Sequence, residues 1–235
     1  MSTPVLVTVP AWNEALNLEA VIGELRRVRP TDDLLVVDDG STDDTAQVAR
    51  RLGCPLLELP FNLGYGAAIQ AGIKHGLRHE YPVVVTFDAD GQHDPGDIAG
   101  LVEAVGAGAD LVLGSRFLAP AYKGSAGRQA GRHLFAGLVR VLTGLRLTDP
   151  TSGMKALGVR AQSLFALARF PDRFPDADAL VLASRARLRV EERPARMRPS
   201  RNRHSMHDGG AIPYTGNMLF SLLVAALCRE ADLRR

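Results

Sequence analysis

The sequence is poor in cysteine and lysine, and its apolar runs are short. Its two cysteines, Cys54 and Cys228, stand far apart among apolar neighbours. Such a pair excludes a disulfide framework or a cysteine metal site and indicates buried thiols in a reducing compartment. The longest apolar run, residues 218–228, has about half the length that a bilayer crossing needs. We therefore expect no membrane span.

The net charge and the first residues of the chain exclude further classes of protein. Lys and Arg exceed Asp and Glu by 28 − 26 = 2, which is too little to indicate a nucleic acid partner. No leader-like segment precedes the first apolar run at Val5, so we expect a cytoplasmic protein. With 46% hydrophobic and 23% charged residues, the composition is that of an ordinary globular protein.

Apolar runs alternate with helical patterns in the first half of the chain. Runs rich in Val and Leu, predicted as strands, lie at residues 5–9, 34–37, 56–59, 83–87 and 111–113, with helical patterns at 16–28, 42–52, 67–77 and 98–105. Short runs without polar alternation suit strands buried on both faces. The order predicts an α/β fold with a mostly parallel central sheet flanked by helices.

The pattern loosens after Arg116. Residues 119–132 are predicted as a loop that leads into a helix at 131–142, and further helices are expected at 176–186 and 212–229, with a strand at 188–191. Eight arginines against two glutamates between residues 185 and 203 favour an anion-binding surface, as at lipid headgroups, over a solvated basic face. We expect one domain over residues 1–193, followed at 194–235 by a basic loop and an amphipathic, apolar C-terminal helix.

Polar segments follow three of the predicted strands, at residues 10–14, 38–42 and 88–94. Open α/β sheets bind ligands at this edge, and no G-x-G-x-x-G follows the first strand to indicate a dinucleotide. Asp88 and Asp90 would repel each other and an anionic substrate unless a divalent cation lay between them. Such oxygen ligands suit Mg²⁺ or Mn²⁺, which in turn hold phosphate. Taken alone, the acidic tract is equally consistent with an ordinary turn.

Together these segments resemble glycosyltransferase family 2, whose members have the nucleotide-sugar-binding GT-A fold. The matching elements are P-x-W-N-E at residues 10–14, D-D-G-S-T-D at 38–43, N-x-G-x-G-x-A at 62–68, D-A-D-G-Q-H-x-P at 88–95, G-S-R at 114–116 and D-P-T-S-G at 149–153. They cover about residues 5–160. The last three elements are similar to the branch of dolichyl- and polyprenyl-phosphate sugar synthases.

The resemblance implies roles for the matched residues. Asp88, Asp90 and Gln92 would hold Mg²⁺ or Mn²⁺, Arg116 would meet a phosphate, and Asp149 would lie near the reacting sugar. The nucleotide-sugar-binding set would be Pro10, Trp12, Glu14, Asp39, Ser41, Asp88, Ala89 and Asp90. A metal and an arginine would stabilise the negative charge that develops on the leaving diphosphate, and in-line attack would invert the anomeric carbon.

The acceptor decides what else the site needs. An alcohol needs a general base, for which Asp149 or Asp178 are candidates. A lipid phosphate is already anionic near neutral pH and needs positioning cations instead. The candidates for the acceptor phosphate are Arg128, Arg132, Arg201, Arg203 and Ser205. Of the R-x-x-G-x-S-K loop that such synthases often carry, only Ser205 is kept in register, because Gly and Lys are missing.

The leading hypothesis is a metal-dependent, inverting transferase that moves a hexose from a UDP- or GDP-linked sugar to a polyprenyl phosphate. It would work at the cytoplasmic face of the membrane, on a peripheral surface or with a separate membrane subunit. The apolar face of the predicted C-terminal helix could equally be buried in the interface of a homo-oligomer or in the core of the fold. Alternatives are a soluble metabolite or glycan acceptor and a non-catalytic nucleotide-sugar-binding subunit. A nucleotidyltransferase is disfavoured, since no Gly-rich basic signature follows the first strand. The sugar and the nucleotide stay open at this stage.

Overall fold

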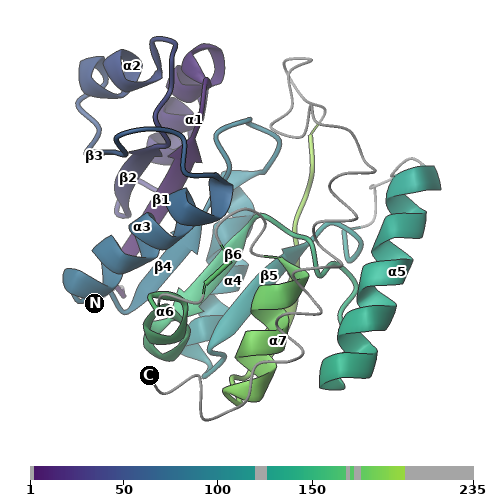
Figure 1. The fold of residues 1–235 in the computed structure, drawn as a ribbon. Coiled ribbons are helices and arrows are strands. Elements are labelled where there is room, and N and C mark those ends of the chain that lie inside the picture. Colours follow the sequence, from purple (N-terminus) through teal and green to yellow (C-terminus); the bar gives the residue numbers. More distant parts are fainter. Residues whose placement is uncertain (1–2, 120–125, 168–169, 172–175, 199–235) are drawn as a thin grey trace.

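The computed structural model describes residues 3–119, 126–167, 170–171 and 176–198, which form an α/β fold around a seven-stranded sheet (Figure 1). The strands are β1 (Val5–Ala11), β2 (Asp33–Asp38), β3 (Leu56–Glu58), β4 (Val83–Thr86), β5 (Leu111–Ser115), β6 (Lys155–Gly158) and β7 (Val190–Pro194). Their order across the sheet is β3-β2-β1-β4-β6-β5-β7. Strand β6 runs antiparallel to its neighbours β4 and β5, whereas the other pairings are parallel. The prediction of a mostly parallel sheet is confirmed.

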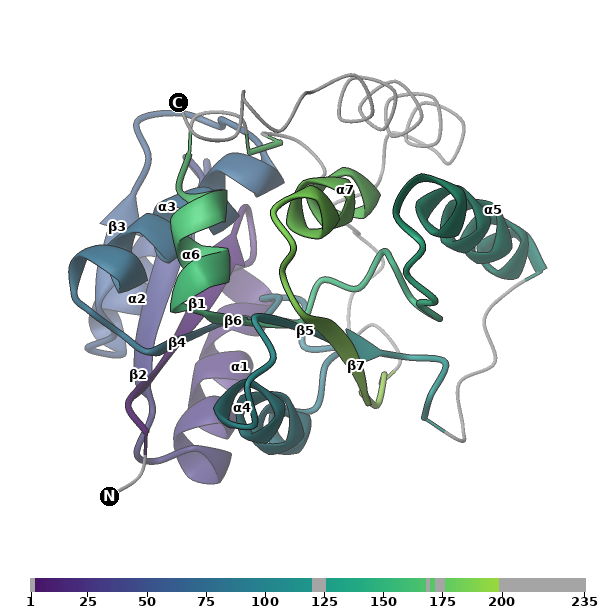
Figure 2. The ribbon, with the colours of Figure 1, turned by 90° about the horizontal axis from the view of Figure 1, so that it is seen from below.

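Helices cover both faces of the sheet (Figure 2). One face carries α1 (Ala15–Val28), α2 (Thr45–Arg51) and α4 (Ile98–Gly106), which the short 3₁₀ helix η1 (Pro95–Asp97) precedes. The other face carries α3 (Tyr65–Arg78), α5 (Ala126–Thr143), α6 (Val159–Phe165) and α7 (Ala177–Arg185). This three-layer arrangement is the one that the alternation of strands and helices predicts.

The central strands divide their side chains between two cores. Val7 and Val85 pack among the residues of α1 and α4, whereas Leu6 and Val84 pack among those of α3 and α7. Successive side chains of a strand point to opposite faces. An uninterrupted apolar run therefore buries both faces, which places these strands at the centre of the fold.

The second half of the chain differs from the sequence-based expectation in three places, one of which is β7, which spans Val190–Pro194 and not residues 188–191. Strand β6 and helix α6 were not predicted, because Lys155–Gly158 is too short and too polar at its start to read as a strand. It becomes one by pairing on both sides, with β4 and with β5. Helix α5 begins at Ala126 and not at residue 131. Residues 126–130, predicted as loop, are therefore helical.

The predicted C-terminal segment lies largely outside the described residues. Cys54 is buried, as expected, while Cys228 and the predicted helix at 212–229 lie outside the described residues. The domain division at residue 193 stays a prediction for the same reason. Among the described helices, none combines the length and apolar character that a bilayer crossing requires.

Candidate active site

The residues expected to form a site converge on one edge of the sheet. Strands β1, β2, β4 and β5 end there, and β6, which runs the other way, begins there. The segments that follow Ala11, Asp38, Thr86 and Ser115 therefore meet the turn that precedes Lys155. Segments far apart in the sequence become neighbours through this topology, as the rule for open α/β sheets predicts.

The loops after β1 and β2 hold each other in place. Asn13 has a positive φ of 56°, its backbone N–H donates to Oγ of Ser41 at 2.9 Å, and its Oδ1 accepts from the N–H of Thr42 at 2.9 Å. The Ser41 hydroxyl also bonds Asp38. Trp12, next in the loop, keeps 39% of its surface exposed. Ser41 thus fixes the loop that presents Trp12.

Asp39 organises a third loop at the same edge. Its two carboxylate oxygens accept backbone N–H groups from Leu63 at 2.8 Å and Gly64 at 2.9 Å, at the start of α3. Burial raises the pKa of Asp39, and these two hydrogen bonds offset only part of that rise. The chain at residues 61–62 passes so close to Gly40 (φ +66°) that any side chain there would collide with its backbone.

Asp88 is held from three sides. The Tyr65 hydroxyl donates to its Oδ1 at 2.6 Å, and Nε2 of His93 lies 3.2 Å from its Oδ2. Gly153 packs directly against the same carboxylate, so that a Cβ there would collide with Oδ2. Burial favours the neutral acid, but the hydrogen bonds from His93 and Tyr65 and the nearby charge of Lys155 together lower the pKa of Asp88. The surroundings of this partly buried carboxylate therefore favour its charged form.

The carboxylates of Glu14, Asp88 and Asp90 repel one another at this edge of the sheet. Burial raises the pKa of Glu14, and the charges of Asp90 and Asp88 raise it further, against the hydrogen bond from Asn17. Within the described residues, no three Asp, Glu, His or Cys side chains are grouped so that they would hold a metal ion by themselves. Mg²⁺, however, is usually bound through one or two carboxylates plus substrate phosphates. The two aspartates, Asp88 and Asp90, fit the carboxylate part of that donor set.

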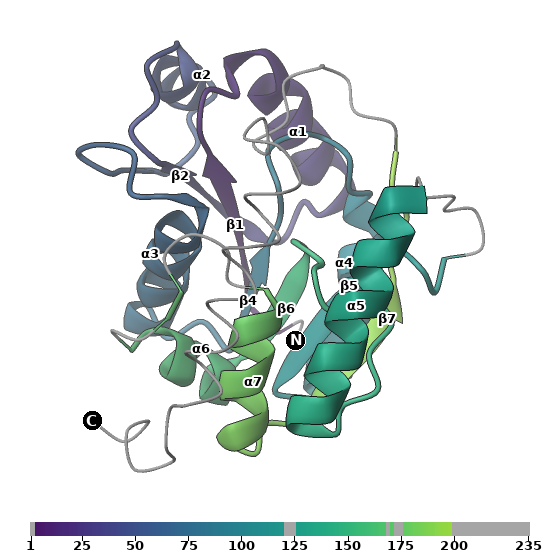
Figure 3. The same cartoon turned by 45° about the vertical axis from the view of Figure 1, so that its right-hand side comes forward.

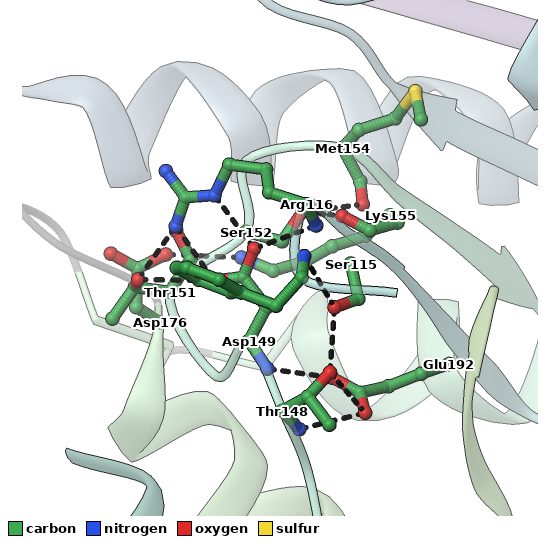
Figure 4. A network of polar contacts seen from close by, with 12 residues as sticks. Ser115, Arg116, Thr148, Asp149, Thr151, Ser152, Met154, Lys155, Asp176 and Glu192 are labelled. Atoms are coloured by element: carbon green, nitrogen blue, oxygen red, sulfur yellow. Dashed lines mark hydrogen bonds and ion pairs between the residues drawn. The ribbon is translucent and has the colours of Figure 1, made fainter. Parts of the chain in front are cut away.

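Arg116 and Asp149, from the segments that follow β5 and precede β6, form a paired unit (Figure 4). Asp149 is fully buried, and Nε and Nη2 of Arg116 donate to its two oxygens at 2.6 Å each, while the Arg116 backbone N–H donates at 3.0 Å. Glu192 in turn accepts from the backbone N–H of Asp149 at 2.8 Å. A carboxylate that already accepts three hydrogen bonds from one arginine is suited to orienting it, more than to acting as a base.

Residues 6–161 match the family model described as Glycosyl transferase family 2. The chain belongs to glycosyltransferase family 2. It is 41% identical over 119 residues to polyprenol monophosphomannose synthase from Mycolicibacterium smegmatis, which is 48% of this chain and 45% of that relative. The chain thus matches less than half the length of this relative. It is 37% identical over 170 residues, 69% of each protein, to undecaprenyl-phosphate mannosyltransferase from Micrococcus luteus. These relatives confirm the resemblance to the polyprenyl-phosphate branch of the family.

A solved structure shows the same fold. Glucosyl-3-phosphoglycerate synthase from Mycobacterium tuberculosis, in complex with Mn²⁺, UDP and glucosyl-3-phosphoglycerate, superposes with a TM-score of 0.70 at 23% identity. The superposition covers 96% of this chain and 80% of that one. The predicted GT-A fold of the family is confirmed by this likeness.

The other residues predicted from the family pattern lie in the interior of the fold, on α5 or α7, or outside the described residues. Pro10 lies buried within β1, opposite Val37, and Ala89 is fully buried between the two aspartates. Asp178 is buried in the first turn of α7, where it accepts from the N–H of Ala179 at 2.8 Å. Arg128 and Arg132 belong to α5, but their side chains are not described. Arg201, Arg203 and Ser205 lie outside the described residues, so the acceptor-phosphate set stays a prediction.

Three residues of the site were missed by the sequence reasoning: Tyr65, His93 and Lys155. The Nζ of Lys155 lies 3.2 Å from Oδ1 of Asp176, and both groups are buried. Tyr65 and His93 stand inside matched motifs, and this position is the signal that points to them. Lys155 carried none, since it reaches the site only because β6 begins there.

The arginines that favoured an anion-binding surface are mostly paired in the described part of the chain. Arg189 and Arg193 contact Glu191 at 2.7 and 2.9 Å, and Arg196 and Arg198 contact carboxylates of their own chain as well. These four arginines are therefore paired with carboxylates of their own chain, two of them sharing Glu191, and the anion-binding surface stays a prediction.

Gly153→Ala tests how tightly the site is packed. Because the new methyl group would collide with the Asp88 carboxylate, we expect a loss of about 1–3 kcal/mol in the free energy of unfolding, as for other overpacked sites. Urea denaturation measures it. Gly137→Ala is the control, since a Cβ at Gly137 meets nothing within 4 Å. Equal stability of the two variants would contradict the packing described.

Proposed function

We propose that the chain is a metal-dependent, inverting glycosyltransferase that moves a hexose from a UDP- or GDP-linked sugar to a polyprenyl phosphate. The observation that carries this proposal is the partly buried Asp88 after β4, whose carboxylate Tyr65, His93 and Gly153 hold in place at the ligand-binding edge of the sheet, with Asp90 two positions further along the chain. Asp88, Asp90 and Gln92 would hold Mg²⁺ or Mn²⁺. When bound, this ion would offset the negative charge of the leaving diphosphate. The Mn²⁺ and UDP bound in the solved neighbour support the assignment.

The remaining residues divide into two groups by position. Trp12, Glu14 and Asp39 would line the pocket for the base and ribose, with the exposed indole of Trp12 offering a surface for stacking. Arg116 would meet a phosphate. Its planar guanidinium suits paired phosphate oxygens, and Asp149 holds it in one orientation. No base is needed for an acceptor that is already anionic.

The lipid acceptor has two lines of support. The names of both relatives contain a polyprenol or an undecaprenyl phosphate. In addition, α5 packs beside α7 and lies on the outside of the fold (Figure 3). It exposes Leu134, Val141 and Leu142, with Val141 84% exposed. An apolar helix surface of this kind supports peripheral attachment at the inner face of the membrane, directly or through a membrane subunit.

A soluble acceptor is the second candidate. The solved neighbour contains glucosyl-3-phosphoglycerate, which is a small phosphorylated molecule on the same fold. Transfer of a sugar to a hydroxyl group of a soluble acceptor would need a general base at that hydroxyl. Asp178 is buried near the start of α7 and remains the candidate for that role.

A donor screen tests the nucleotide-sugar assignment. We expect the melting temperature of the chain to rise with either UDP- or GDP-sugars, and only when Mn²⁺ is present. A ligand at about 100 times its Kd adds about 2.7 kcal/mol of stability, which differential scanning fluorimetry detects. Equal shifts with and without Mn²⁺ would contradict metal dependence. The absence of a shift with every nucleotide sugar would contradict the donor class.

A further inference from the structure

The chain that leaves β7 returns over the loop that carries the acidic motif. The backbone N–H of Arg198 donates to the carbonyl of Gln92 at 2.8 Å, and His93 and Met197 form an isolated antiparallel bridge. Residues 196–198, called the strap from here on, thus lie as a short extended segment against residues 92–94. The strap lies beyond the residues 6–161 that match the family.

The strap also supplies positive charge to this loop. Nη2 of Arg196 lies 2.8 Å from Oδ1 of Asp97 and 3.3 Å from Oδ2 of Asp94, and its backbone N–H donates to Asp97 at 2.6 Å. Arg198 contacts Glu24 of α1 at 2.7 Å and Asp94 at 3.2 Å. Two arginines therefore contact three carboxylates and tie the loop to α1.

This pairing divides the four aspartates of residues 88–97 into two sets. The outer two, Asp94 and Asp97, are balanced by the strap, while the inner two, Asp88 and Asp90, are the proposed ligands of the cation. Between the sets, the backbone of Gln92 is fixed at both of its polar groups, since its N–H donates to Oδ1 of Asp90 at 2.9 Å and its carbonyl accepts from the strap. His93, the next residue, contacts both Asp88 and the strap.

We propose that Arg196 and Arg198 are positioning residues for the metal-binding loop. They neutralise its outer carboxylates and hold the backbone of Gln92 and His93, and through these residues they set the geometry of the oxygen ligands. This inference rests on the proposed function and extends it to a segment about a hundred residues further along the chain. Groups that orient metal ligands typically change metal affinity about 10- to 100-fold when removed.

The test compares R196A and R198A with a matched control, R160A. Arg160 pairs with Asp110 at 2.8 Å at the opposite end of β5, and its side chain is 62% exposed, against 61% for Arg196. Binding of Mn²⁺ in the presence of UDP or GDP is measured from the electron paramagnetic resonance signal of the free ion, and circular dichroism reports the fold. We expect the Kd for Mn²⁺ to rise about tenfold in R196A and R198A and to stay unchanged in R160A.

Two results would overturn the strap's role: an unchanged Kd for Mn²⁺ in folded R196A, or an equal rise in R160A. If R198A loses its fold, R196A still decides the question, because the exposed side chain of Arg196 can be removed with little loss of packing. Rescue of Mn²⁺ binding by R198K would support the role of charge at that position. Failure of the unaltered chain to bind Mn²⁺ with either nucleotide would contradict the proposed function itself.

Discussion

Asp90→Ala is expected to lower kcat/KM for sugar transfer by about 10²- to 10³-fold, the usual cost of losing one group that stabilises transition-state charge. The chain should keep its fold. Replacing Asp90 relieves the charge that raises the pKa of Glu14, so it removes repulsion as well as a proposed metal ligand. Initial rates at saturating Mn²⁺ measure the change.

The control for this experiment is Asp33→Asn. Asp33 begins β2 at the opposite edge of the sheet, where it is exposed and accepts a hydrogen bond from Tyr81 at 2.8 Å. We expect its rate to match that of the unaltered chain. Full activity of Asp90→Ala, or an equal loss in Asp33→Asn, would contradict the assignment of the acidic pair.

Removing the carboxylate of Asp149 should have the second large effect, on stability as well as on rate. Asp149→Ala leaves Arg116, about four-fifths buried, without its bidentate partner. Breaking a buried ion pair from one side typically costs about 3–5 kcal/mol. Urea denaturation measures this cost, and the rate of transfer in Asp149→Asn shows whether the orientation of Arg116 matters for turnover.

The same pair separates a positioning role from a base role. If Asp149 only orients Arg116, then Arg116→Ala, Asp149→Asn and the double variant should lose similar amounts of activity, because coupled residues are not additive. The pH dependence of kcat should also keep its shape in Asp149→Asn. Disappearance of the acid limb of that profile would restore Asp149 as the general base.

The sequence predicts those elements that have a clear local pattern of apolar and polar residues. Strands β1, β2 and β4 were found because their apolar runs are buried on both faces, and the polar residues that follow them were placed at one edge by topology alone. The acidic pair, Asn13 and Ser41 all lie in those segments, although the hydrogen bond between Asn13 and Ser41 was not part of the prediction. Family motifs then supplied the chemistry of the site.

What the sequence could not predict depends on contacts between distant segments. Strand β6 has only four residues and exists because β4 and β5 flank it. The pairing of Arg116 with Asp149 joins residues 33 positions apart, and that of Arg196 with Asp97 joins residues 99 positions apart. No periodicity reports such pairs, so the sequence does not show that Arg189, Arg193, Arg196 and Arg198 pair with carboxylates of their own chain.

The proposed transfer is tested most directly by following the labelled sugar. The chain is incubated with Mn²⁺, radiolabelled UDP- and GDP-hexoses and polyprenyl phosphate, and the organic phase is assayed for a lipid-linked product. The account predicts a hexosyl phosphate lipid of inverted anomeric configuration, formed with release of the nucleoside diphosphate and absent with Asp90→Ala. Label that stays in the aqueous phase with every donor, or that moves only to soluble acceptors, would contradict the lipid acceptor. Release of pyrophosphate would indicate nucleotidyl transfer instead.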